Sequence, residues 1–132
     1  MMNSSQSYLT SAKRQFNYYK TLGEKAMDQL EAKQLFATPN EDSNSIAVIV
    51  KHLWGNMLSR WTDFLTTDGE KPSRNRDGEF LNDLQTKEAV IQKWNEGWDC
   101  LFKTLDSLTE DDLSKIIYIR NEGHTAMEAI NR

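Results

Sequence analysis

Apolar residues recur at intervals of three and four along three long stretches of the chain. The first series consists of Leu9, Ala12, Phe16, Tyr19, Gly23, Ala26 and Leu30. This spacing is that of one face of an α-helix, so we expect a helix over residues 5–32 with its apolar side in a bundle core. Gly23 costs about 1 kcal/mol relative to alanine in a helix, and we interpret it as a point of close helix approach.

Two further series predict two further helices. The second consists of Ile46, Ile49, Leu53, Met57, Trp61 and Phe64, and the third of Val90, Trp94, Trp98, Leu101, Leu105 and Leu108. They predict helices over residues 45–66 and 86–108. Ile46, Val48, Ile49 and Val50 are β-branched and alone favour a strand, but the periodicity through Phe64 overrides that interpretation. We interpret Trp94 and Trp98 as core residues and not as cofactor contacts.

The connection over residues 66–85 is charged and contains two Asp-Gly pairs and a Lys-Pro. A loop of this length in a small domain is usually functional or mobile. Two interpretations of Arg74 and Arg76 stay open. They can meet an anionic ligand at the mouth of the bundle, or they can be solvated, as loop arginines usually are.

The last stretch predicts a crossing segment and a fourth helix. The four central residues of 115–120 are β-branched or aromatic, which favours an extended connector across the bundle end. Thr125 and Glu128 fit a capping box, so a helix should begin at Ala126 and run over residues 125–132. Fewer than two turns of it are present. The pattern predicts one all-α domain over residues 1–132, with an incomplete fourth helix.

Composition narrows the function classes. The 132 residues carry a net charge of −4, which disfavours non-specific nucleic-acid binding. No apolar run has the length of a membrane span, and the first residues lack the apolar middle of a signal peptide. Cys100 is the only cysteine, so no internal disulfide can form, and no activating base lies near it in sequence. We expect a cytoplasmic protein without nucleic-acid or membrane partners.

The candidate chemistry centres on His52. With Asn56 and Ser59 it forms a narrow polar strip beside the apolar face of the second helix, so we expect it to face the bundle interior near one end. A lone histidine is weak evidence, because a catalytic imidazole-type metal site needs three protein ligands and an open position. His124 precedes the fourth helix, and Asp63 and Glu128 lie off the required face, so none of them is expected to complete such a site.

A family resemblance is carried by SIAVIVKHLWGNMLSRWTDFLTTDGEKPSRNRDGEF at residues 45–80 and by RNEGHTAMEAINR at residues 120–132. Over about residues 8–132 the chain resembles the DinB-like, YfiT-like metal-dependent hydrolases. The resemblance implies an up-down-down-up four-helix bundle. It also implies a divalent metal, nickel or zinc, held by one histidine of the second helix and two of the fourth. His52 matches the first ligand, and no residue of this chain matches the other two.

The resemblance implies an enzyme that hydrolyses a small-molecule substrate, or one that transfers a low-molecular-weight thiol such as bacillithiol to an electrophile. The alternative is a non-enzymatic helical-bundle protein that acts through dimerisation. With one matched ligand of three, the chain as given is expected to bind divalent metal weakly or not at all.

An incomplete fourth helix should leave an apolar groove along the other three. The candidates to line it are Leu9, Phe16, Leu53, Met57, Trp61, Trp94, Trp98 and Leu101. Burying one such side chain is worth about 1.5–3 kcal/mol, and exposed grooves of this kind usually become interfaces. We therefore predict a symmetric homodimer. Two alternatives are that the three helices close on themselves, and that the natural protein continues beyond Arg132.

Overall fold

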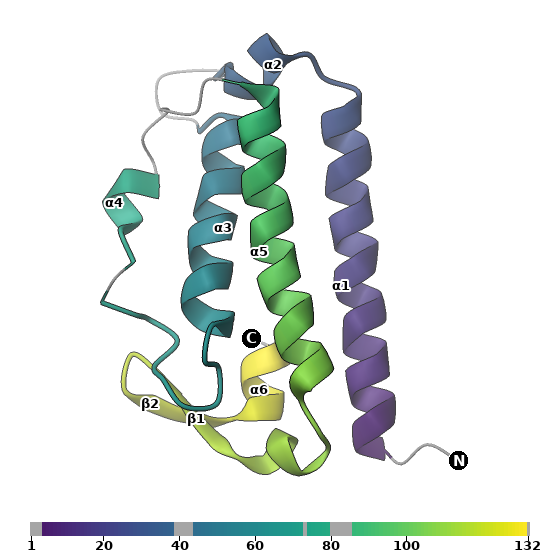
Figure 1. The fold of residues 1–132 in the computed structure, drawn as a ribbon, viewed down its shortest axis with the longest axis vertical. Coiled ribbons are helices and arrows are strands. Elements are labelled where there is room, and N and C mark those ends of the chain that lie inside the picture. The colour runs from purple at the N-terminus through teal and green to yellow at the C-terminus, as the bar shows by residue number, and fades with distance from the viewer. Residues whose placement is uncertain (1–3, 39–43, 73, 80–85, 132) are drawn as a thin grey trace.

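Three long helices run side by side in the computed structural model, which describes residues 4–38, 44–72, 74–79 and 86–131 (Figure 1). They are α1 (Ser4–Asp28), α3 (Ile46–Trp61) and α5 (Lys87–Ser107). The shorter elements are α2 (Ala32–Phe36), α4 (Arg76–Glu79), the 3₁₀ helix η1 (Asp111–Ser114), the strands β1 (Ile116–Ile119) and β2 (Glu122–Thr125), and α6 (Ala126–Asn131). The prediction of a mainly helical chain is confirmed.

Local capping explains where the long helices begin. The hydroxyl of Ser45 accepts the N–H of Val48 at the start of α3, and that of Thr86 accepts the N–H of Ala89 at the start of α5. Side-chain oxygens at these positions satisfy backbone donors that have no partner within the helix. Both starts agree with the sequence prediction to within one residue.

Two predicted helix ends were wrong. The first helix ends at Asp28 and not at residue 32, because α2 begins as a separate helix, where the Gln34 side chain accepts the N–H of Glu31. The second helix ends at Trp61 and not at residue 66. Asp63 adopts a left-handed φ of 49°, and its carbonyl accepts the N–H groups of residues 66 and 67 in a turn. A left-handed residue cannot continue a right-handed helix.

The core lies where α5 packs between α1 and α3. Trp94 and Trp98 are buried, as predicted, and meet edge-to-face with ring centroids 5.6 Å apart. A Cβ on Gly23 would lie 2.4 Å from Cη2 of Trp94, so the expected close approach is confirmed. Tyr19, expected in the core, is 61% exposed instead, because it lies at the edge of a groove that no other described element fills.

A small hairpin closes one end of the bundle. The predicted extended segment is β1, and it pairs antiparallel with β2, which the sequence analysis did not predict. Arg120 and Asn121 connect them with φ angles of 51° and 66°, as a two-residue turn with the primed twist requires. The Asp68 carboxylate accepts the N–H groups of both turn residues, so the loop after α3 is fixed to the hairpin. The same backbone donors, together with the N–H of Glu70, hold the pKa of Asp68 below its usual value.

The helix α6 begins at Ala126, as predicted. The Thr125 hydroxyl accepts the N–H of Glu128 at 3.1 Å, and the Glu128 carboxylate accepts the hydroxyl proton and the N–H of Thr125. The Tyr8 hydroxyl reaches from α1 to the Met127 carbonyl at 3.1 Å and to Oδ1 of Asn131 at 2.8 Å. These bonds fix α6 against α1 at the hairpin end of the bundle.

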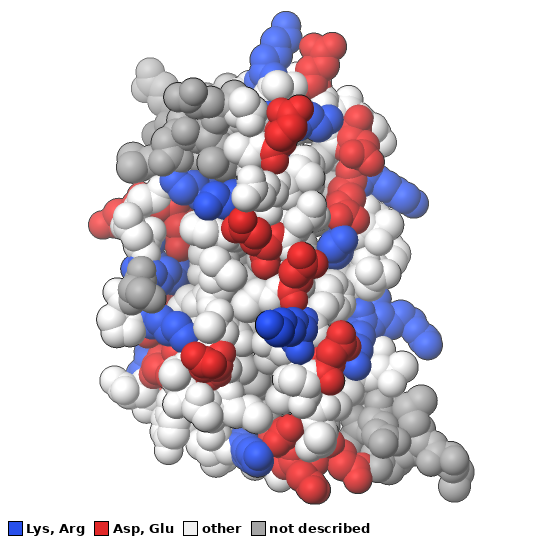
Figure 2. Space-filling view, in the orientation of Figure 1, with Lys and Arg blue, Asp and Glu red and all other residues white. Residues whose placement is uncertain are grey.

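Charged side chains of both signs alternate over the face seen in Figure 2, and neither sign gathers into a patch there. Among the described residues, no helix combines the length and the apolar character that crossing a membrane requires.

Candidate functional site

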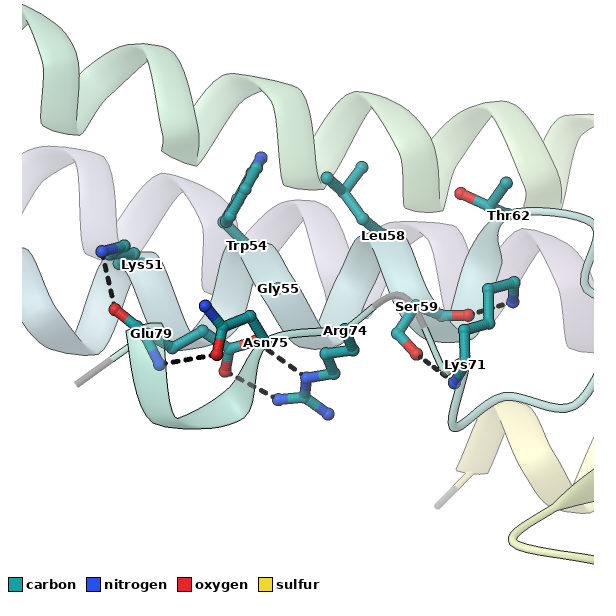
Figure 3. A pocket seen from close by; sticks show the side chains of 11 residues that line it. Lys51, Trp54, Gly55, Leu58, Ser59, Thr62, Lys71, Arg74, Asn75 and Glu79 are labelled. Carbon is teal, nitrogen blue, oxygen red and sulfur yellow. Dashed lines mark hydrogen bonds and ion pairs between the residues drawn. The ribbon is translucent and has the colours of Figure 1, made fainter. Parts of the chain in front are cut away.

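A buried chain of charged groups connects α4 to His52 on α3. Nδ1 of His52 lies 3.0 Å from Oε1 of Glu79. The guanidinium of Arg74 donates two hydrogen bonds to the same carboxylate, from Nε to Oε2 and from Nη2 to Oε1, and each is 2.9 Å long (Figure 3). The Glu79 and Arg74 side chains are only 2% and 3% exposed, whereas His52 is 35% exposed. The chain therefore runs from a buried ion pair to an imidazole that solvent can reach.

The backbone of α3 makes room for this carboxylate. Glu79 lies directly over Gly55, where a Cβ would come within 1.9 Å of Oε2. The short helix α4 is held in place from both sides. Lys51 of α3 donates to the carbonyl of Gly78 at 2.7 Å, and the Asn75 side chain accepts the N–H of Gly78. A glycine on α3 and a docked turn of helix together position Glu79.

Electrostatics keep Glu79 ionised. Burial alone would raise its pKa, but the hydrogen bonds and charge of Arg74, with a smaller contribution from His52, outweigh burial and hold the pKa below its usual value. Glu79 in turn raises the pKa of Arg74. A carboxylate anion beside Nδ1 favours the tautomer in which Nδ1 carries the proton, which leaves the lone pair on Nε2.

A cavity of about 540 Å³ lies beside this chain of groups. Trp54, Leu58 and Thr62 line one side of it, and Arg74 and Glu79 lie along the other (Figure 3). Apolar walls with a few polar groups are typical of small-molecule sites.

The cavity also holds two lysines. At one end, Lys71 bonds to the carbonyls of Ser59 and Asp68, and burial lowers its pKa. Lys51 lines the cavity as well. Because Arg74 is paired with Glu79, the two lysines leave the lining with a net positive charge, which favours a ligand with an anionic group.

The two arginines of the predicted loop differ, because Arg76 is exposed, as the solvated interpretation expected, whereas Arg74 fits neither interpretation made from the sequence. Arg74 is neither solvated nor open to a ligand, because Glu79 and Glu70 occupy its guanidinium. Arg76 is 44% exposed and lies 3.2 Å from Glu70. Residues 73 and 80–85 of this predicted loop lie outside the described part of the chain.

The other metal-ligand candidates lie apart from His52. His124 is on β2 at the hairpin end, away from the first half of α3, and its Nε2 is 3.8 Å from Glu122 (Figure 1). Glu128 is used in the cap of α6. Within the described ranges, no group of three or more His, Cys, Asp or Glu side chains is placed to hold a metal ion.

Sequence reasoning missed the partner of His52. Glu79 lies 27 positions away, in a stretch predicted as loop, and no local pattern connects the two residues. The available signal was Gly55, a glycine inside a predicted helix and one turn from His52. Such a glycine marks close approach of another group.

A protein-family comparison matches residues 3–132 to the family described as "Protein of unknown function (DUF1572)". The chain belongs to the DUF1572 family. No curated protein and no solved structure matches this DUF1572 chain significantly. The matched range includes the whole His52–Glu79–Arg74 chain of groups, α6 and the hairpin.

Proposed function

We propose that this DUF1572 protein is a cytoplasmic DinB-like, YfiT-like bundle of up-down-down-up topology, and that His52 is a ligand for a divalent metal, nickel or zinc. The activity would be metal-dependent hydrolysis of a small molecule, or transfer of a low-molecular-weight thiol. The observation that carries the proposal is the Arg74–Glu79–His52 chain of hydrogen bonds.

The chain of groups has the form of a metal ligand with its supporting residues. Metal-binding histidines usually donate their second ring N–H to a carboxylate, which fixes the ring and raises its basicity. Glu79 supplies that carboxylate to His52, and Arg74 holds the carboxylate ionised and in position. A buried ion pair contributes little net stability compared with apolar residues of the same volume, so its presence behind an accessible imidazole favours a role in a site.

The described residues supply one oriented ligand and do not fit a complete three-ligand centre. A bound metal would lower the pKa of a water or thiol at the site. The part played by this chain is to hold His52 in one tautomer and to offer an anion-favouring cavity nearby. Binding by the chain as given is accordingly expected to be weak.

Calorimetric titration with zinc or nickel tests this proposal. We expect weak binding that His52→Ala abolishes and that Glu79→Gln weakens about tenfold, the lower end of the usual effect of a supporting residue. The matched control, His124→Ala, should bind as the wild type does. Circular dichroism of each variant checks that the fold is kept.

Binding that survives in His52→Ala would overturn the proposal. Tight stoichiometric binding lost in His52→Ala would instead contradict the weak-affinity prediction, and would show that a discounted residue or a second chain supplies the missing ligands.

A further inference from the structure

The cavity beside the candidate site has a lysine at each end and a largely apolar wall between them (Figure 3). Lys51 lies at the end next to α4, and Lys71 lies at the opposite end. The wall is formed by Trp54, Leu58 and Thr62, which follow one another at intervals of four residues and so share one row of α3. From Trp54 to Thr62 this row is about 12 Å long, at about 1.5 Å per residue. The cavity therefore suits an elongated ligand that lies along α3.

The Lys71 ammonium is a half-buried charge with no carboxylate partner in the described part of the chain. It donates to the backbone carbonyls of Ser59 and Asp68, which are neutral acceptors. These two bonds leave one of its three N–H donors for a ligand. The charges of Asp63 and Asp68 act on it only at longer range, and burial outweighs them in lowering its pKa. Because a charge removed from water is normally paired, an anion bound here would complete the site.

The opposite end of the cavity suits an anion less well. Lys51 donates to the Gly78 carbonyl at 2.7 Å, and this bond holds α4 in place. The Glu79 carboxylate lies toward this end in Figure 3, and it is the one acidic side chain among the described residues that line the cavity. Its negative charge would repel a second carboxylate placed beside it. An acidic group of a ligand is therefore expected at the Lys71 end.

We propose that the cavity binds an elongated monocarboxylic acid, whose carboxylate pairs with Lys71 and whose apolar body lies over Leu58 and Trp54. Apolar walls with a few polar groups at fixed points match such a ligand. The far end of the acid then lies at the level of Glu79, which is bonded to His52. As the substrate class of the proposed metal-dependent enzyme, this acid rests on the proposed function, whereas its binding to the metal-free protein does not.

Titration of the metal-free protein with octanoate, followed by NMR chemical shifts, tests the ligand class. For so small a probe the dissociation constant should be on the order of 10⁻⁴–10⁻³ M. Octanol has the same apolar chain without the charge and should bind at least about tenfold more weakly, because it cannot form a charge-assisted hydrogen bond. Acetate keeps only the carboxylate and should also bind at least about tenfold more weakly. Either octanol or acetate binding as tightly as octanoate would overturn the proposal.

Substitution of single lysines tests which of them pairs with the acid. We call the ratio of octanoate affinity to octanol affinity the carboxylate preference. Lys71→Met should abolish this preference, and Lys51→Met should keep it. The matched control is Lys103→Met, which removes the same charge from an exposed position of α5 outside the cavity and should leave the preference unchanged. Lys71→Arg retains the positive charge and should retain a carboxylate preference, which separates the loss of charge from damage to the loop.

The outcomes separate this inference from the metal proposal. A carboxylate preference that is lost in Lys51→Met and kept in Lys71→Met would place the acid at the other end and overturn the inference. A preference that survives in every lysine variant would overturn it as well. His52→Ala, which should abolish metal binding, should bind octanoate as the wild type does. Because the octanoate titration contains no metal and the metal titration contains no octanoate, the two proposals fail separately.

Discussion

Replacing Gly55 with alanine adds one methyl group at a helical position where the gain is usually favourable. Alanine is about 1 kcal/mol better than glycine inside a helix. In this protein the new Cβ would lie 1.9 Å from Oε2 of Glu79 and 2.4 Å from its Cδ. Real Cβ atoms do not approach other atoms so closely, so the carboxylate must leave its place.

The expected loss of stability follows from the interactions that Glu79 makes. Its carboxylate accepts two bonds from Arg74 and lies 3.0 Å from His52, and the side chains of Glu79 and Arg74 are almost wholly buried. Breaking a buried ion pair costs about 3–5 kcal/mol, because an unpaired charge remains inside the protein. Subtracting the helix gain of about 1 kcal/mol leaves a net destabilisation of about 2–4 kcal/mol for Gly55→Ala.

Urea unfolding followed by far-ultraviolet circular dichroism measures this loss. With a slope of about 2 kcal/mol/M, the midpoint should fall by about 1–2 M. A companion experiment introduces Gly55→Ala into the Glu79→Ala variant and compares the stability of the double variant with that of Glu79→Ala alone. Once the carboxylate is gone, the methyl has room, and the second substitution should stabilise the protein by up to about 1 kcal/mol. If Gly55→Ala alone is as stable as the wild type, the carboxylate does not occupy the place over Gly55 and this reasoning is refuted.

Two further outcomes follow from the same kind of geometry. Gly23→Ala should destabilise the protein by about 1–3 kcal/mol, because its Cβ would press into the ring of buried Trp94; urea unfolding checks this, and a gain in stability would contradict it. Asp68, Glu79 and Asp112 all have lowered pKa values, Asp112 chiefly through its bonds from a lysine and a backbone N–H. At acidic pH the unfolded chain therefore binds more protons than the folded protein does. Stability should be flat above about pH 5 and fall as the pH drops through about 4 and below, and unfolding that becomes harder in acid would show the opposite sign.

The parts of the fold that could be predicted are those fixed by neighbours in sequence. The apolar spacing located α1, α3 and α5, and the capping box of Thr125 and Glu128 correctly predicted the first residue of α6. The predicted ends of the first two helices were wrong because the observed ends depend on weaker local interactions. Gln34 begins a new helix by bonding to Glu31, and Asp63 turns the chain with a left-handed φ. Asn121, a residue that tolerates positive φ, was the one available sign of the hairpin.

Of the three residues that make up the candidate site, the sequence pointed only to His52. His52 was singled out because residues 45–80 resemble the DinB-like, YfiT-like family and because it lies on a polar strip of its helix. Glu79 and Arg74 were not, because their place depends on how a turn of helix docks on Gly55, and 27 residues separate Glu79 from His52. The groove was predicted better than the site, since six of the eight residues expected to line it from regular helical spacing do so.

The bond from Tyr8 to α6 bears on the order in which the chain folds. Tyr8 and Met127 are 119 positions apart, against 27 for His52 and Glu79. The entropy lost in closing a loop grows with the logarithm of its length, so this closure costs about 1.3 kcal/mol more. Synthesis makes the delay larger, because α1 leaves the ribosome long before α6 has been translated. During that interval the part of α1 that α6 later contacts stays uncovered.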